Sequence, residues 1–393
     1  MFPEQLEKKV RKIIKDVRLK GDDALIDFTK KFDAVVLKHE ELKVSKYDMK
    51  QAYKRVDRDF LTAVQTAKKN INAFYKNSKA KSWKMKSKGV ELGEIFRPID
   101  SVGVYVPGGK FPYPSTILMT VVPAKVAGVK RIVVVTPPKN ITAEVLVAAD
   151  IAGVDEMYRV GGAQAIAALA YGTQAIHRVD KIVGPGNSYV ACAKQNVFGD
   201  VGIDVIAGPS EVAVIADSSA DASFVIQDLM AQVEHGMEAN ATLITTSKDL
   251  VEQVKNNLVT TKERGANIEI ILVKSLSRAA DIVNNMAPEH LELIVKNPRA
   301  LLPKIRHAGA IFLGAFSPVA AGDYIAGPSH VLPTGGAARF SSGLGIGDFM
   351  KRSSVIYYTK EALKKHAKAI EKLAEVEGFT THAQTIKVRF SKK

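Results

Sequence analysis

A glutamine and a histidine three residues apart, Gln232 and His235, close a predicted helix and could together hold a metal ion. Residues at this spacing lie on one flank of a helix, so both side chains can reach one ion from the last turn. Gly236 then ends the helix. A histidine at a helix C-terminus is also often only a favourable cap, so the pair alone leaves both interpretations open.

Glu289 and His290 are adjacent, just after a proline that ends the preceding predicted helix. A carboxylate and an imidazole at an irregular turn can face one site, whereas on a regular strand they would point to opposite faces. Two proton-transfer groups with different pKa values suit a two-stage reaction. The other interpretation of these two residues is an exposed polar turn.

Three further side chains of the metal-ligand type occur late in the chain: Asp323, His330 and His382. Zinc commonly takes histidine and carboxylate ligands, so they form a chemically reasonable set with the pair in the helix. The spacing does not show whether these residues converge.

Four Gly/Pro turns at predicted strand ends could bind a dinucleotide. They are Val106–Gly109, Val160–Gly162, Val183–Asn187 and Ala207–Glu211. Ligands of doubly wound sheets bind at the carboxyl ends of the strands, where small residues let backbone N–H groups approach a pyrophosphate. The chain has no G-x-G-x-x-G fingerprint, and the segment 184–189 lacks its third glycine. Ordinary loops between strands and helices remain an equal alternative.

The elements that must position these residues alternate between strand and helix from about residue 100 onward. Short Val/Ile-rich strands separated by helices imply parallel sheets covered on both faces. The expected strands are 102–106, 131–136, 156–160, 180–183, 212–216, 241–246 and 268–273. The expected helices are 114–128, 142–153, 162–171, 187–198, 220–235, 248–258 and 275–286. Two such series predict an α/β fold with two Rossmann-like domains.

Both ends of the chain are expected to be small helical parts. Residues 4–76 carry apolar side chains at helical spacing, and 345–393 is basic and helical with a short extended end at 385–390. We expect 1–104 with 211–344 to form the first Rossmann-like domain and 105–210 the second. Residues 345–393 would form a small C-terminal domain.

The net charge of +15 raises the question of nucleic-acid binding. The excess lies in residues 1–100 and 351–393, within amphipathic helix patterns, while 101–350 is slightly acidic. A solvated basic surface is therefore favoured, and no nucleic-acid or membrane partner is expected. The single cysteine, Cys192, lies in an apolar stretch, which favours a buried thiol over a nucleophile. One cysteine fits a reducing, cytoplasmic setting, and no apolar run is long enough to span a bilayer.

From about Val10 to Phe390 the sequence resembles the histidinol dehydrogenase family. The stretches that carry the resemblance occur in the family's order. They are Val104–Gly109, Val183–Asn187, Gly202–Val212, Gln232–His235, Ala287–His290, Ala321–Tyr324, His330–Thr334, Arg339–Leu344 and Glu377–His382.

The resemblance implies roles residue by residue. The implied ligands of one Zn²⁺ per subunit are Gln232, His235, Asp323 and His382. The implied catalytic pair is Glu289 and His290. The implied substrate contacts are Ser210, His330 and Glu377, together with the four zinc ligands and His290. The implied NAD contacts are Tyr105, Gln164 and Asn187.

The resemblance also implies a reaction and an assembly. The reaction takes L-histidinol to L-histidine through an aldehyde, as two NAD are reduced. The assembly is an intertwined homodimer whose C-terminal segment reaches the partner's active site, so Glu377 and His382 would act in trans. The N-terminal arm is expected to be short. The alternative is a relative with the same zinc and NAD chemistry on another amino or hydroxy alcohol, and the presence of His330 and Glu377 argues against it.

Overall fold

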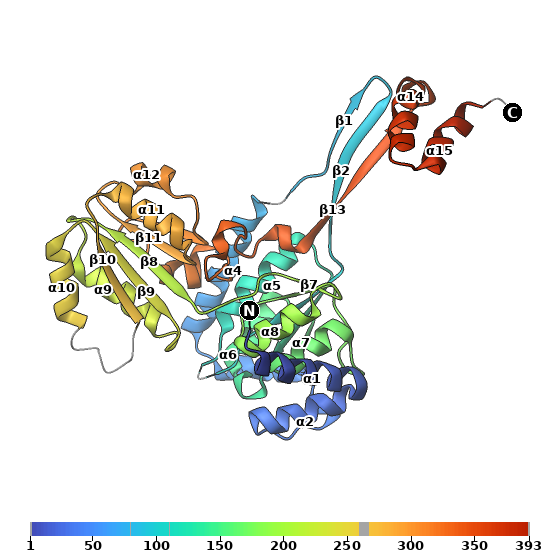
Figure 1. The fold of residues 1–393 in the computed structure, drawn as a ribbon. Coiled ribbons are helices and arrows are strands. Elements are labelled where there is room, and N and C mark those ends of the chain that lie inside the picture. The colour runs from blue at the N-terminus through green and yellow to red at the C-terminus, as the bar shows by residue number, and fades with distance from the viewer. Residues whose placement is uncertain (1, 79, 110, 259–266, 392–393) are drawn as a thin grey trace. The chain divides into compact units, whose positions relative to one another are not determined.

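The computed structural model describes residues 2–78, 80–109, 111–258 and 267–391 (Figure 1). The chain divides into two compact units. The larger unit is Met1–Ser78 with Ile99–Phe349, and the smaller is Lys79–Pro98 with Met350–Lys393. The larger unit holds two five-stranded parallel sheets, which confirms the expected α/β class with parallel sheets.

The first sheet has the strand order β5-β4-β3-β6-β7. Its strands are β3 (Ser101–Tyr105), β4 (Arg131–Thr136), β5 (Glu156–Arg159), β6 (Lys181–Val183) and β7 (Gly202–Ile203). Its crossover helices are α5 (Pro114–Ala127), α6 (Ala143–Ala152), α7 (Gly162–Tyr171) and α8 (Ser188–Val197). The chain winds outward from β3 in both directions, so the switch point at which doubly wound sheets bind ligands lies between β3 and β6.

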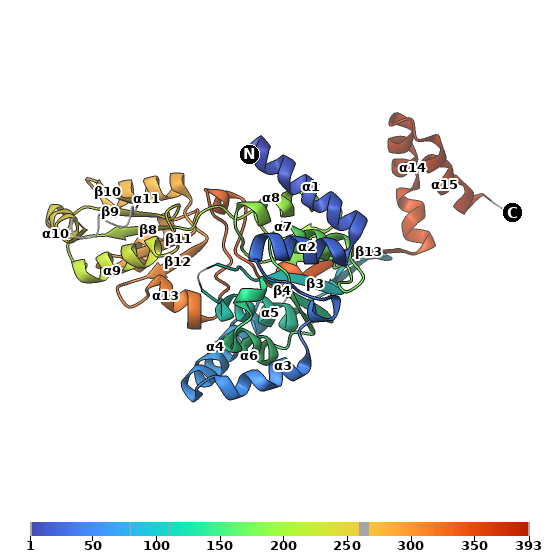
Figure 2. The same ribbon diagram turned by 90° about the horizontal axis from the view of Figure 1, so that it is seen from below.

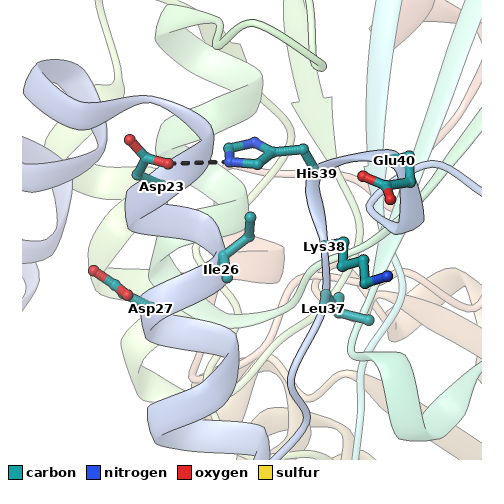
Figure 3. Close-up of a pocket in the computed structure, with 7 residues that line it drawn as sticks. All are labelled: Asp23, Ile26, Asp27, Leu37, Lys38, His39 and Glu40. Carbon is teal, nitrogen blue, oxygen red and sulfur yellow. Dashed lines mark ion pairs between the residues drawn. The ribbon is translucent and has the colours of Figure 1, made fainter.

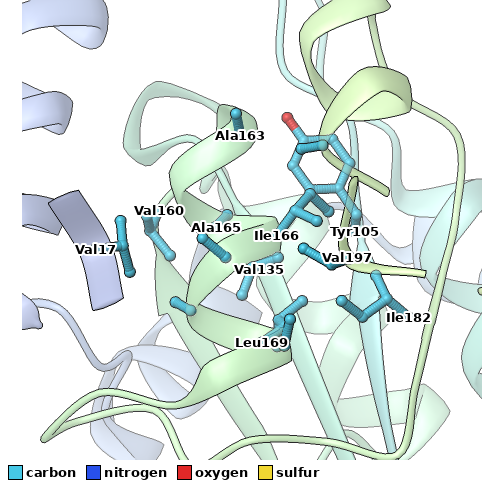
Figure 4. Packing of buried hydrophobic residues seen from close by; sticks show 14 of the residues in the cluster. Val17, Tyr105, Val135, Val160, Ala163, Ala165, Ile166, Leu169, Ile182 and Val197 are labelled. Carbon is cyan, nitrogen blue, oxygen red and sulfur yellow. The ribbon is translucent and has the colours of Figure 1, made fainter. Parts of the chain in front are cut away.

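The N-terminal helices pack on this first sheet. The apolar stripe of α1 (Glu4–Lys20), including Val10 and Val17, lies in one buried cluster with Val135 of β4 and Leu169 of α7 (Figure 4). The expected grouping of residues 1–104 with 211–344 therefore differs from the observed packing. Helical spacing shows that α1 has an apolar face, but it does not show which sheet that face covers.

The remaining N-terminal helices are α2 (Asp22–Asp33), α3 (Lys46–Ala52) and α4 (Arg58–Lys76). Helix α4 packs against α5 and α3 packs against α6 (Figure 2). This second layer explains why α5 is apolar on all sides, with nearly every residue from Thr116 to Ala127 buried.

The second sheet repeats the same winding, in the order β10-β9-β8-β11-β12. Its strands are β8 (Glu211–Ala216), β9 (Asn240–Thr245), β10 (Asn267–Leu272), β11 (His290–Ile294) and β12 (Ala310–Leu313). One buried cluster lies under α9 (Ala222–Val233) and α10 (Lys248–Leu258). Another lies under α11 (Leu276–Met286) and α12 (Pro298–Leu301). Most expected elements between residues 102 and 286 are thus confirmed, with ends shifted by one or two residues.

The smaller unit is not purely helical. Strands β1 (Trp83–Ser87), β2 (Val90–Pro98) and β13 (Met350–Tyr358) form an antiparallel sheet in the order β1-β2-β13. Helices α14 (Lys360–Val376) and α15 (Thr380–Phe390) complete it. The expected extended end at 385–390 is wrong, because it is the last part of α15. The expectation of helix alone at 345–393 is also wrong, since this segment contains strand β13. The strand was missed because it is mostly exposed and lacks the buried apolar run that marked the other strands.

Among the described residues, no helix is long and apolar enough to cross a membrane. Cys192 is free and completely buried in the core of the first sheet, as its apolar surroundings predicted.

Candidate active site

A cavity of about 610 Å³ in the larger unit gathers most of the candidate residues. One wall comes from the loops after β3 and β6, at the carboxyl edge of the first sheet. The other wall comes from the loops that lead into β8, β9 and β11, at the amino edge of the second sheet. The candidates that line the cavity are Asn187, Ser210, His235, Glu289, His290, Asp323 and His330.

One sequence expectation about the turns needs correction. Ala207–Glu211 does not close a strand but leads into β8, so it approaches the cavity from the opposite edge. A hydrophobic run locates a strand, but it does not show whether a nearby Gly/Pro turn follows that strand or leads into the next one.

The Glu289 carboxylate is held through one of its two oxygens. Its Oε2 accepts hydrogen bonds from Ser210 Oγ at 2.6 Å and from Glu211 N at 3.0 Å. Burial raises the pKa of Glu289 above its usual value, against the opposing charge of His290 and these two hydrogen bonds. The other oxygen, Oε1, is the one left to act on a molecule in the cavity.

His290 begins β11 and presents one ring nitrogen to the site. Its Nδ1 lies 3.3 Å from the carbonyl oxygen of Glu211, so Nδ1 carries the proton in the neutral ring. Its Nε2 is buried, has no hydrogen-bond partner among the residues that the structure describes, and lies 3.7 Å from Asp323 Oδ1. Burial lowers the pKa of His290, but Asp323 and Glu289 outweigh it, so the pKa is raised overall. When the ring is neutral and its proton is on Nδ1, Nε2 has the free lone pair that a general base needs.

Three donors of this unit could hold a metal ion. Gln232 is buried at the end of α9, and its amide Nε2 has no partner among the described residues. His235 directs Nδ1 to the Gln232 carbonyl oxygen at 3.2 Å, which leaves Nε2 free. Burial opposes ionisation of Asp323, but His290 and the other nearby histidines hold its pKa below the usual value. A metal ion would bind the side-chain oxygen of Gln232, not its amide nitrogen. A free imidazole nitrogen and an ionised carboxylate are ligands that suit zinc, which usually takes four.

The described residues contain no group of three or more His, Cys, Asp or Glu side chains that could hold a metal ion. Of the candidate ligands in this unit, His235 and Asp323 line the same cavity, and Gln232 lies three residues before His235 at the end of α9. His382, the remaining candidate ligand, is exposed on α15 of the smaller unit, and the exposed Glu377 directly follows α14 there.

Both ring nitrogens of His330 contact other groups of the protein. Nδ1 lies 3.0 Å from the carbonyl oxygen of Asp323, and Nε2 lies 3.3 Å from Thr116 Oγ1. Burial lowers the pKa of His330 and so favours the neutral ring. A second cavity of about 640 Å³ is also lined by His290, Asp323 and His330, which therefore stand in the wall between two hollows.

Two threonines that the sequence analysis did not single out support the site. Thr116 contacts His330, as described, and Thr334 Oγ1 accepts a hydrogen bond from Gly208 N at 2.6 Å. Thr334 lies within a stretch already noted, His330–Thr334, whereas nothing in the sequence around Thr116 distinguished it.

The three candidate NAD contacts lie at the carboxyl edge of the first sheet. The Tyr105 hydroxyl accepts a hydrogen bond from Gly162 N at 3.0 Å, at the start of α7. Gln164 is buried, and its Oε1 has no hydrogen-bond partner in the described part of the chain. Asn187 Oδ1 caps α8 by accepting from the backbone of Tyr189 and Val190. Of the three, only Asn187 lines the cavity.

Comparison with known proteins identifies the family. The model of the family described as histidinol dehydrogenase matches residues 2–390. The chain belongs to the histidinol dehydrogenase family. It is therefore an oxidoreductase.

Histidinol dehydrogenases from several bacteria match over nearly the full chain. The enzyme of Clostridium acetobutylicum is 49% identical over 401 residues, covering 98% of this chain and 93% of that protein. The enzyme of Listeria monocytogenes serovar 1/2a is 49% identical, covering 99% and 94%. The crystal structure of histidinol dehydrogenase from Elizabethkingia anophelis superposes with a TM-score of 0.94 at 37% identity, covering 99% and 93%.

Another hollow of the larger unit lies away from these groups, between α2 and residues 37–40 (Figure 3). It is lined mainly by charged surface side chains, among them the pair Asp23 and His39 at 3.1 Å. None of its residues has a role implied by the histidinol dehydrogenase family.

A second carboxyl group lies on the same face of β11 as His290. Glu292 Oε1 accepts a hydrogen bond from Val319 N at 2.8 Å, and Oε2 is buried with no donor within the described ranges. Burial, then the negative charge of Asp228 on α9, raises the pKa of Glu292 to about 8. Glu292 is therefore protonated near neutral pH, and so it does not place a second buried negative charge beside Asp228.

This carboxyl predicts a pH-dependent stability. Because its folded pKa lies above the unfolded value, the stability that Glu292 contributes is full at acid pH and is lost as the pH rises toward 8. Glu292→Gln should remove this component, worth at most about 1.4 kcal/mol per pH unit. Thermal unfolding from pH 5 to 9 should therefore show a flatter curve for Glu292→Gln. The exposed Glu269→Gln should follow the wild type, and parallel curves for all three proteins would contradict the prediction.

Proposed function

We propose that the protein catalyses the zinc- and NAD-dependent, four-electron oxidation of L-histidinol to L-histidine through the aldehyde, the last step of histidine biosynthesis. The observation that carries the proposal is the convergence of Glu289, His290, Asp323 and His330 on one cavity whose opposite wall includes Asn187. The experiment that tests the proposal measures whether two NADH are formed for each L-histidinol consumed.

In the first stage, Nε2 of His290 takes the proton of the substrate hydroxyl as hydride leaves the carbon. The Nδ1 contact with the Glu211 carbonyl supports this role, because it fixes the tautomer with a bare Nε2. The raised pKa of His290 means that its basic form becomes populated at higher pH than in a free imidazole.

In the second stage, Glu289 removes a proton from the water that attacks the aldehyde. A carboxyl group with a raised pKa is a stronger base than an ordinary carboxylate, which suits it to this task. Ser210 was expected to contact the substrate. Its hydrogen bond to Glu289 supports a further role, namely orienting the carboxylate.

Gln232, His235, Asp323 and His382 would hold the zinc ion. When bound, zinc would fix the imidazole and amino nitrogens of histidinol, and such orientation can lower a barrier by several kcal/mol, up to ~7–11 in the best intramolecular models. His330 and Glu377 would complete the substrate contacts.

Tyr105, Gln164 and Asn187 would contact NAD, which when bound accepts the hydride in each stage. The fit of a dinucleotide is supported by Oε1 of Gln164, which is buried without a partner among the described residues. Two glycines at the same edge of the first sheet let the turns pack closely against Pro137. A Cβ on Gly108 or Gly161 would lie within about 2.4 Å of Pro137, so only glycine fits at these turns.

The proposal includes a homodimer in which His382 and Glu377 complete the partner's site. Two observations support it. If Gln232, His235 and Asp323 hold the zinc ion, the larger unit leaves one of the four usual positions for a ligand from elsewhere. The smaller unit leaves large apolar side chains uncovered, with Ile356 69% and Val376 72% exposed, as expected of a surface that a partner covers.

Mixing two inactive variants tests this shared site. His382→Ala and His290→Ala subunits, each inactive alone, should regain activity when mixed, because a heterodimer can assemble one site with both wild-type residues. Activity is measured after subunit exchange, and mass spectrometry measures the heterodimer fraction. Heterodimers without recovered activity would place both residues in the same subunit's site.

A further inference from the structure

A buried ion pair lies beneath the first sheet's glycine turn. Lys194 projects from α8 and Asp204 follows β7, and each side chain is only 2% exposed. Removing two charges from water is costly, and an apolar pair of similar size is often at least as stable. Stability alone is therefore a poor explanation for this pair.

The pair binds both polar backbone groups of Gly184. Lys194 Nζ donates to the Gly184 carbonyl oxygen at 3.0 Å as well as to Asp204 Oδ1, and Asp204 Oδ2 accepts from Gly184 N at 2.7 Å. Gly184 directly follows β6 and has φ +110°, and a Cβ there would lie 2.2 Å from the carbonyl oxygen of Tyr105. Gly184 thus packs closely against the end of β3, at the point where the chain leaves β6.

The turn that starts at Gly184 forms part of the cavity wall. Pro185, Gly186 and Asn187 line the cavity, and Asn187 ends the turn by capping α8. The turn is therefore held at its first residue by the ion pair and at its last by the cap. Between these points its backbone lies at the switch point, beside the N-terminus of α8, where a diphosphate can be bound.

We propose that Lys194 and Asp204 are positioning residues for the diphosphate of the dinucleotide. They hold the turn 184–187 in its binding conformation before the cofactor arrives, and neither residue touches the cofactor. Binding is strengthened because the backbone does not have to be ordered at that moment. The inference rests on the proposed use of NAD.

A neutral double variant is the sharpest test. Lys194→Met alone would leave the Asp204 carboxylate buried without its cation and could unfold the protein. Lys194→Met combined with Asp204→Asn removes both charges and leaves the Gly184 carbonyl without its donor. The control is Lys181→Met, which breaks the ion pair of Lys181 with Asp348 at the other end of β6.

The measurements are the Kd of NADH and the Kd of L-histidinol on the zinc-loaded enzyme, with thermal unfolding to verify folding. The double variant should bind NADH ~10–100-fold more weakly, the range seen when a supporting partner of a metal ligand is lost, while the Kd of histidinol stays unchanged. Lys181→Met should change neither. The inference would be overturned if the double variant bound NADH as tightly as the wild type, or if its affinities for NADH and L-histidinol fell equally. It would also be overturned if the double variant failed to fold. A wild-type protein that does not bind NADH would instead contradict the proposed function.

Discussion

In a single-turnover experiment, Glu289→Gln should form close to one NADH per site and then stall with the aldehyde on the enzyme. The two stages need different proton chemistry, and the glutamine can accept the hydrogen bonds of Ser210 and Glu211 but cannot accept a proton from water. Loss of a general base typically costs ~10²–10⁴-fold in the step that it serves. The variant should therefore oxidise supplied aldehyde more slowly than the wild type by that factor, while it continues to oxidise the alcohol at a substantial rate.

His290→Asn is the matching comparison, because it should slow the first hydride transfer as well. Rapid-quench analysis of NADH and aldehyde in both variants separates the stages. If Glu289→Gln slowed only alcohol oxidation and handled added aldehyde normally, the roles assigned to these two residues would be wrong. The family membership of the chain would still stand.

The second large effect concerns the metal. His235→Asn should lower zinc content and activity together, because the Nε2 left free by the contact of Nδ1 with the Gln232 carbonyl would be lost. The shorter asparagine cannot replace it as a ligand. Zinc per subunit is measured by atomic spectroscopy on the purified variant, and turnover is measured on the same sample.

Glu234→Gln is the matched control, since Glu234 is exposed, adjacent in sequence and without an expected role. It should retain zinc and turnover. A His235→Asn protein with stoichiometric zinc and normal turnover would remove His235 from the metal site.

The fold of the two parallel sheets could be predicted because their central strands, such as β4, β8 and β9, are almost entirely buried. Residues 131–136 and 162–171 were predicted with their observed ends, since a Val/Ile run or an apolar helix is bounded there by turn residues. Strands β1 and β13 could not be predicted this way, because their side chains are mostly exposed. Strand β11 was hidden by Glu292, whose buried carboxyl interrupts an otherwise apolar run.

The candidate site was predictable as a set of residue types but not as a geometry. The sequence places Glu289 beside His290, yet only the fold brings Asp323 to within 3.7 Å of the imidazole. Ser210 was expected as a substrate contact, but its support of Glu289 and the role of Lys194 were missed for a related reason. Ser210 and Lys194 act through hydrogen bonds across about 80 and 10 residues of chain, and neither bond has a local sequence signal.

The most direct test of the central proposal is the number of NADH formed per L-histidinol consumed by the wild-type enzyme. The measurement follows NADH by absorbance and both amino compounds by chromatography, on zinc-loaded and on chelator-treated protein. We expect two NADH and one L-histidine per L-histidinol with zinc, and loss of turnover after zinc removal that returns when zinc is added. One NADH per histidinol with the aldehyde as the released product, or full turnover in verified zinc-free protein, would contradict the account.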